Sequence, residues 1–321
     1  MPEPQRHQDA ETKRGSKHPV CPGAPVSPSL GASKAASKFL ANAALAALFL
    51  AVFSSPSSQA AEEPSQTGSE VYARAKALYE TQDRKAAFNL FKQAADQGDP
   101  ECAAAVGFLY DSGEDGIKNP AQAVRYLRQG AEGGVTKAQY NLAMTLRRSP
   151  AKSEALDEAI FWLNQAAEGN FERAQIQLGE IYYFGDDHTP RNYQTARYYL
   201  EKATAYENPQ ANHLLGLIFL SGLDAPKDPE KARTYLTLAA RKGHAKAQAV
   251  LGKALATGKE GVKKDMVQGL FWLHVSAEQG EALAQNSLGE LQMAADEKTL
   301  AAVEQAVAQW QKDPSSVSVI D

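Results

Sequence analysis

The sequence predicts an all-α, right-handed superhelical solenoid of about seven helical hairpins. A short pattern returns every 36 or 37 residues, reading LFKQAADQG at 90–98 and WLNQAAEGN at 162–170. Within each copy the apolar residues are spaced by three, four and seven, which places them on one stripe of an α-helix. A fixed period of this length is typical of stacked units that cannot bury their apolar faces alone.

One helix of each unit carries a small residue at a constant phase. These marker residues are Ala94, Gly130, Ala166, Ala203, Ala239 and Ser276. In five copies Asp or Asn stands eleven residues earlier, where its side-chain oxygen can accept a hydrogen bond from the free N–H groups of a helix start. These residues are Asp83, Asn119, Asn192, Asp228 and Asp265. We expect each such helix to end at a left-handed residue, which Gly and Asn adopt most easily. The candidates are Gly98, Gly134, Asn170, Gly243 and Gly280.

The other helix of each unit contains a glycine at its middle. A glycine inside a helix costs about 1 kcal/mol relative to alanine, so its return at one phase predicts close approach of a neighbouring helix. The positions are Gly107, Gly179, Gly216, Gly252 and Gly289. This glycine-containing helix is called the first helix of a hairpin, and the helix with the marker is called the second helix.

These residues resemble the Sel-one-like repeats, relatives of the tetratricopeptide repeat with slightly longer units. The first-helix match consists of Ala174, Leu178, Gly179, Tyr182 and Gly185. The loop and second-helix match consists of Gly261, Val262, Asp265, Trp272, Ala277 and Gly280. The resemblance implies a tetratricopeptide-like solenoid and a non-catalytic adaptor or scaffold, as in many exported bacterial members. A branch with paired cysteines in each repeat is linked to β-lactam binding, but this chain contains only Cys21 and Cys102.

The N-terminal region predicts export. Fifteen residues without a charge, 39–53, follow Lys34 and Lys38 and precede an Ala-x-Ala-like site that predicts cleavage near Ala60. The alternative is a retained N-terminal membrane anchor. The predicted segments are a disordered leader (1–38), a signal peptide hydrophobic and cleavage region (39–60), a linker (61–69), the solenoid (70–295), a C-terminal capping helix (296–312) and a disordered tail (313–321).

The composition gives no positive support for catalysis. The whole chain has a net charge of −4 and residues 1–60 carry +3, so the rest of the chain carries about −7. Such an acidic region disfavours nucleic acid as a partner. No catalytic, cofactor-binding or metal-binding residue is predicted, and a loop with Asp186, Asp187 and His188 is more typical of a solvated turn than of a cation site. We expect no cofactor. The lone cysteine of the solenoid, Cys102, is expected to be a small buried residue.

One face of the first helices is unusually apolar for an exposed stripe, and it predicts the site of partner binding. We define this first-helix stripe by its residues, which are Phe108, Tyr140, Met144, Arg147, Ile176, Glu180, Tyr183, His213, Leu217 and Leu220. An apolar and aromatic stripe flanked by charge is typical of a groove for a peptide or helix. The alternative is that neighbouring helices bury these side chains. Arg147 and Arg148, beside an irregular third loop at 147–152, would suit an acidic segment of a partner.

The function favoured by the sequence is a non-catalytic scaffold that binds a protein partner and is periplasmic or secreted after cleavage. Membrane contact is expected only through an uncleaved N-terminal segment. The competing hypothesis is an envelope hydrolase or peptidoglycan-active enzyme, for which Glu180 with His213 is the only hint in the sequence.

Overall fold

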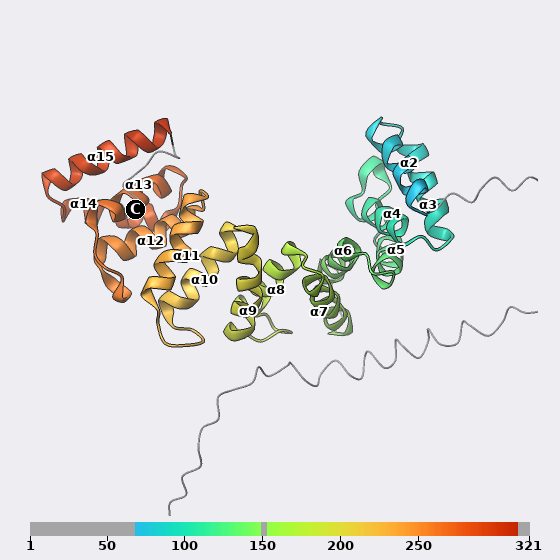
Figure 1. Ribbon diagram of the computed structural model, residues 1–321, viewed down its shortest axis with the longest axis horizontal. Helices are drawn as coiled ribbons and strands as arrows, with labels where there is room; N and C mark the ends of the chain where they lie inside the picture. Colours follow the sequence, from blue (N-terminus) through green and yellow to red (C-terminus); the bar gives the residue numbers. More distant parts are fainter. Residues whose placement is uncertain (1–67, 149–152, 314–321) are drawn as a thin grey trace, which may run out of the picture. The chain divides into compact units, whose positions relative to one another are not determined.

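The computed structural model describes residues 68–148 and 153–313, which form fourteen α-helices and three short 3-10 helices, with no strand among them. The first six helix pairs are hairpins, and each hairpin also packs against the next one in chain order (Figure 1). The pairs are α2 (Gly68–Glu80) with α3 (Arg84–Asp96), α4 (Pro100–Ser112) with α5 (Pro120–Glu132), α6 (Thr136–Arg148) with α7 (Ser153–Glu168), α8 (Glu172–Phe184) with α9 (Tyr193–Ala203), α10 (Pro209–Ser221) with α11 (Pro229–Arg241), and α12 (Ala245–Thr257) with α13 (Met266–Glu278). The described chain is therefore the all-α helical solenoid that the sequence predicts.

The predicted start of each second helix is confirmed. The side chains of Asp83, Asn119, Asn192, Asp228 and Asp265 each accept a hydrogen bond from the backbone N–H three residues further on. The predicted ends are confirmed as well, because Gly98 has a φ of 105° and Asn170 has a φ of 57°. The same two local signals therefore bound α3, α5, α11 and α13, whereas α7 shows only the predicted end and α9 only the predicted start.

The glycine at the middle of the first helix lies where the second helix of the same hairpin crosses it. A Cβ atom on Gly107 would lie 2.7 Å from Leu127, and one on Gly216 would lie 2.6 Å from Leu236. Both distances are shorter than a side chain can tolerate, so the close approach predicted from the repeated glycine is confirmed. One turn further along, an aromatic ring of the first helix stacks on one of the second, as Phe219 does on Tyr235 with an interplanar angle of 7°.

The C-terminal end departs from the hairpin pattern. Helix α14 (Ala282–Met293) packs on α12 and α13, but α15 (Glu297–Lys312) packs on α13 (Figure 1). The Trp310 ring lies edge-on to Phe271 and Trp272, at centroid distances of 5.7 Å and 5.6 Å. Helix α15 thus covers the side of α13 where Phe271 and Trp272 lie.

The predicted leader, signal peptide region and most of the linker lie outside the described residues, as do residues 149–152 of the third loop and most of the tail. Among the described helices, none combines the length and the apolar composition needed to cross a bilayer.

Candidate functional site

The first-helix stripe is half-buried along most of its length. Tyr140, Met144, Ile176, Tyr183 and Leu217 are all partly accessible. Phe108, on α4, is more open, with 47% of its surface exposed. The structure therefore places these six apolar residues at successive first helices, each with part of its surface available for contact.

Two residues of the predicted stripe are buried instead. His213 and Leu220, on α10, are only 6% and 8% exposed. Leu220 belongs to the core cluster formed by α9 to α13, so the alternative of burial by neighbouring helices applies to it and to His213. The reason is that α10 is apolar around most of its circumference, with nine buried residues among thirteen. Neither side chain is available to a partner.

Both tyrosines of the stripe pack against neighbouring rings. The Tyr140 ring packs against Phe171 at a centroid distance of 5.3 Å, and Tyr183 is edge-on to Phe184 and to Tyr193 at 4.9 Å and 5.6 Å. Burial raises the pKa of both the Tyr140 and Tyr183 hydroxyls. Both rings are thus held in place while part of each remains accessible, a combination that limits the entropy lost when a partner binds.

Glu180, a polar member of the stripe, is hydrogen-bonded within the solenoid. Glu180 accepts a hydrogen bond from Nε2 of Gln210 at 2.9 Å, and Oε1 of Gln210 lies 2.9 Å from Nε2 of His244. The other ring nitrogen of His244 accepts the N–H of Ala247 at the start of α12, so Nε2 carries the proton and donates to Gln210. This chain of hydrogen bonds joins α8, α10 and α12.

His213 stacks on this network without joining it. Its ring centroid lies 4.6 Å from that of His244, and its buried Nδ1 has no hydrogen-bond partner among the described residues. Burial, reinforced by the nearby charges of His244 and Lys246, lowers the pKa of His213 to about 4. Glu180 is bonded to Gln210 and not to His213, so the pair suggested by the sequence does not form an acid–base unit here.

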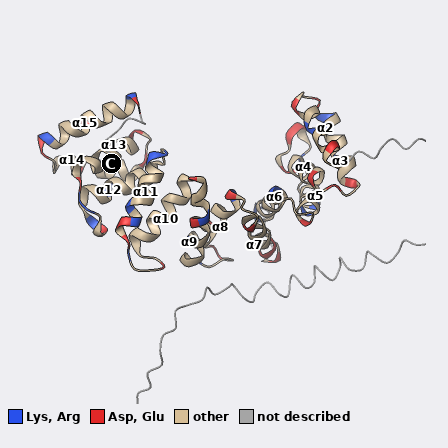
Figure 2. Cartoon of the chain, viewed as in Figure 1, with Lys and Arg blue, Asp and Glu red and all other residues tan. Residues whose placement is uncertain are grey.

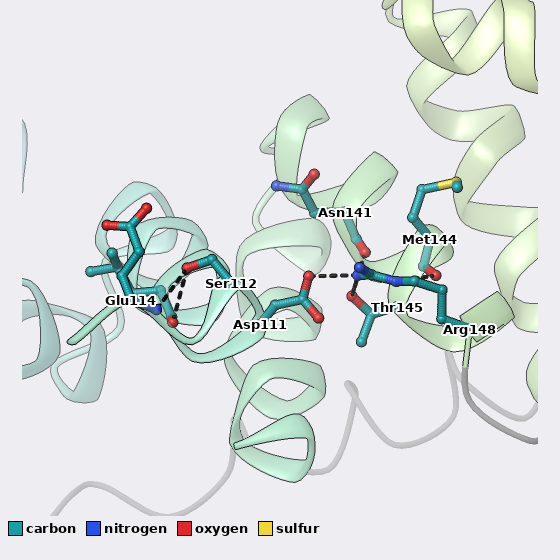
Figure 3. Close-up of polar contacts among 8 residues, drawn as sticks. Asp111, Ser112, Glu114, Asn141, Met144, Thr145 and Arg148 are labelled. Atoms are coloured by element: carbon teal, nitrogen blue, oxygen red, sulfur yellow. Dashed lines mark hydrogen bonds and ion pairs between the residues drawn. The ribbon is translucent and has the colours of Figure 1, made fainter. Parts of the chain in front are cut away.

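Arg147 and Arg148 are both engaged across the repeats. Arg147 pairs with Asp186 on the following repeat at 2.9 Å, while Arg148 pairs with Asp111 on the preceding one at 2.5 Å. Figure 3 shows that the Arg148 guanidinium also reaches Oγ1 of Thr145, which lies 3.2 Å away. Two acidic residues of the chain thus already pair with these arginines, and a role for the arginines in binding an acidic segment of a partner stays a prediction.

The rest of the described residues show no group of three or more His, Cys, Asp or Glu side chains placed to hold a metal ion. A shallow cleft of about 370 Å³ lies between α13, α14 and α15, where Gly289, Met293 and Val303 contribute to its walls.

Cys102 is fully buried, as expected, and burial together with Asp99 raises the pKa of its thiol to about 12.

Two sets of surface residues were not predicted from the sequence. Gln210 and His244 were not singled out, although they order the polar centre of the stripe. Phe161 and Tyr198 were also missed, although they stand at one phase of consecutive second helices, five residues before the marker. That shared phase was the signal that could have identified them.

Helical hairpins stacked in this way form a solenoid repeat protein, a class in which neighbouring repeats together present extended binding surfaces. The chain belongs to the Sel1 repeat family. The Sel1 repeat model matches six segments, at residues 71–99, 100–135, 136–171, 172–205, 209–244 and 245–281. Proteins of this family are generally protein-interaction scaffolds and typically non-catalytic.

Two solved structures are similar over most of the chain. One is a protective antigen present in uropathogenic Escherichia coli strains that displays an SLR fold, with a TM-score of 0.63 and 26% identity, covering 77% of this chain and 56% of that one. The other is a Sel1 repeat protein from Oxalobacter formigenes, with a TM-score of 0.59 and 28% identity, covering 73% of this chain and 95% of that one. These similarities extend the family assignment to the three-dimensional fold.

Two curated relatives are similar over part of their length. An uncharacterized protein of Neisseria meningitidis is 36% identical over 162 residues, which are 50% of this chain and 33% of that protein. The chitin synthase regulator SKT5 of Saccharomyces cerevisiae is 31% identical over 132 residues, which are 40% of this chain and 19% of that protein. The chain thus aligns with a third or less of each relative.

Proposed function

We propose that this chain is a non-catalytic scaffold, exported to the cell envelope, that binds a partner protein through the first-helix stripe. The observation that carries the proposal is the run of half-buried apolar side chains on consecutive first helices. Tyr140, Met144, Ile176, Tyr183 and Leu217 each keep accessible surface beside a polar network that is already satisfied. A segment of a partner can therefore bury apolar area there without leaving a buried charge unpaired.

The occupant that fits this stripe is a peptide or helix with apolar anchors spaced to reach successive repeats. Export is supported by the uncharged run at 39–53 and the small residues before Ala61 in the sequence. On this proposal the mature protein begins near Ala61 and is periplasmic or secreted, while a retained N-terminal anchor would leave the same solenoid at the membrane surface.

The test is affinity capture of partners by the full-length chain in its native cells, with the mature N-terminus read by mass spectrometry. The variant carries Phe108→Ala, Tyr183→Ala and Leu217→Ala, and the control carries Leu238→Ala, an exposed apolar residue outside the stripe. We expect a stoichiometric partner that the control retains and the variant loses, and an N-terminus near Ala61. Circular dichroism must show that the variant remains folded, because unfolding would mean that Tyr183 and Leu217 are core residues. A partner held equally by all three chains contradicts the stripe, and an intact N-terminus in the cytoplasm contradicts export.

A further inference from the structure

Aromatic side chains stand in adjacent pairs at one phase of three second helices. The pairs are Phe161 with Trp162 on α7, Tyr198 with Tyr199 on α9, and Phe271 with Trp272 on α13. All three pairs are edge-to-face, with centroid distances of 4.9 Å, 5.1 Å and 5.0 Å. The second ring of each pair faces the hairpin core, while the first ring lies on the outer side of its helix. We call Phe161, Tyr198 and Phe271 the outer rings.

In α13 the structure shows what covers an outer ring. Phe271 has no exposed surface, because α15 lies across it with Trp310 edge-on at an interplanar angle of 78°. Ala306 and Val307 of α15 pack against the same cluster, so the cover is an amphipathic helix with one aromatic anchor. Aromatic pairs in this arrangement contribute about 0.5–1.5 kcal/mol beyond the area that they bury.

In α7 and α9 the equivalent rings are open in the part of the chain that the structure describes. Phe161 is 43% exposed and Tyr198 is 53% exposed. These residues lie on neighbouring repeats, and their helices are joined by the Tyr199 hydroxyl, which donates to Oδ1 of Asn164 at 2.5 Å. Two partly exposed outer rings, on consecutive second helices that this hydrogen bond joins, form a surface of the kind that α15 covers on α13.

The charge beside these rings indicates the chemistry of an occupant. Helix α7 contains four acidic residues and no basic one (Figure 2). Three of the acidic residues stand seven before, four before and seven after Phe161, which places them on the same side of the helix as its ring. These are Glu154, Asp157 and Glu168, all exposed, of which Asp157 also lies 3.1 Å from Nε2 of His188. A cation lies over the other ring, on α9, where the Lys202 ammonium is 4.8 Å from the centre of the Tyr198 ring.

We propose that the outer face of α7 and α9, formed by Phe161 and Tyr198 and flanked by Glu154, Asp157 and Glu168, is a second docking surface that takes a basic amphipathic helix of a partner protein. An aromatic side chain of that helix covers Phe161 in the way that Trp310 covers Phe271. The Lys or Arg residues of that helix lie beside the three acidic residues of α7. The surface is made by second helices, so it is separate from the first-helix stripe and allows one scaffold to hold two partners.

A designed peptide that imitates α15 tests this surface directly. The probe is a fluorescent peptide with the sequence of residues 296–313 in which Glu297 and Glu304 are replaced by Lys, and its own control replaces Trp310 by Ala. Anisotropy titrations use the full-length chain, the double variant Phe161→Ala with Tyr198→Ala, and Leu238→Ala as a matched loss of exposed apolar surface on another second helix. We expect the double variant to bind the probe at least tenfold more weakly, Leu238→Ala to bind it unchanged, and the control peptide to bind weakly to every chain.

Three results would overturn the proposal. These are equal binding by the wild type and the double variant, equal binding of both peptides, and affinity that does not fall as salt rises, because salt screens exposed charges. A double variant of the first-helix stripe, with Tyr183→Ala and Leu217→Ala, separates this surface from the proposed function. This double variant should bind the probe with the affinity of the wild type. Loss of partner binding at the first-helix stripe and loss of probe binding at the outer face of α7 and α9 can therefore be told apart. The probe could also bind at Phe271 by replacing α15. In that case the variant Phe161→Ala with Tyr198→Ala would still bind the probe, and this result would count against the proposal.

Discussion

A Cβ atom on Gly179 would lie 2.5 Å from Cδ2 of Leu200, whereas one on Gly289 would have no described atom within 4 Å. The two glycines hold the same phase of their helices, α8 and α14. The difference arises because α9 crosses α8 at Gly179, whereas α15 leaves α14 and packs on α13. Close helix packing thus requires the glycine in α8, whereas the glycine in α14 only lowers the stability of its helix.

This contrast predicts opposite effects of one substitution. Gly179→Ala should destabilise the chain, because overpacking costs about 1–3 kcal/mol and exceeds the roughly 1 kcal/mol that alanine gains in a helix. Gly289→Ala should stabilise the chain by up to about 1 kcal/mol. The midpoints of urea unfolding check both, and shifts of the same sign would mean that α15 occupies a different place in solution.

The buried imidazole of His213 predicts a loss of stability in acid. Its pKa is lowered to about 4 in the folded chain from the usual 6.5 of histidine, mainly because the ring is buried. The unfolded chain therefore binds a proton first as the pH falls. The stabilising effect of the neutral ring is complete above pH 6.5 and is lost between there and pH 4, by up to about 3 kcal/mol.

The variant His213→Gln cannot titrate and should lose less stability than the wild type between about pH 7 and pH 4.5, the range in which only the unfolded chain takes up the proton. Thermal midpoints at the two pH values measure the difference. Parallel behaviour of both chains would show that His213 is accessible to solvent in the folded state.

Trp310 predicts a local effect at the C-terminal end. Trp310→Ala removes the ring that covers Phe271 and Trp272, at a cost of roughly 3 kcal/mol, the low end for a large residue because the Trp310 ring is only partly buried. Since repeats contact only their neighbours, amide hydrogen exchange should accelerate in α13 and α15 and stay unchanged in α4 and α5. Met293→Ala is the control, because that side chain is 84% exposed. Equal acceleration along the whole chain would contradict this local role.

Cys102 predicts a protected thiol. It is fully buried, and its pKa is raised to about 12, so little thiolate exists at neutral pH and a reagent has no access to it. In a chain with Cys21→Ser, a thiol reagent should react with Cys102 only after addition of denaturant. Prompt reaction in the folded chain would show that α3 and α4 separate readily.

The repeat pattern predicted the fold closely because each of its signals is local. The side chain of Asp228 caps α11 from its own sequence neighbourhood, and the left-handed Gly243 ends the same helix. Burial along the stripe was harder to predict. Leu217 and Leu220 are both apolar residues of one helix, yet whether each is covered depends on residues distant in sequence.

The arginine pair shows the same limit. Arg147 and Arg148 have no acidic residue within helical spacing, so the sequence left them without partners. Asp186 and Asp111 reach them from the two adjacent repeats, 39 and 37 residues away. Contacts at about one repeat length could be sought in such chains by comparing charges across successive copies.

Helix α15 also constrains how a protein of this kind can change its length. The hairpins from α4 to α13 present similar edges to their neighbours, so a duplicated unit could be inserted among them in frame and would find compatible surfaces on both sides. After α14 the next helix, α15, packs on α13 and leaves Gly289 of α14 without a crossing helix, so this end does not present the edge that the other hairpins share. A duplicated hairpin is therefore expected to be tolerated between α4 and α13 and to fit less well directly after α14.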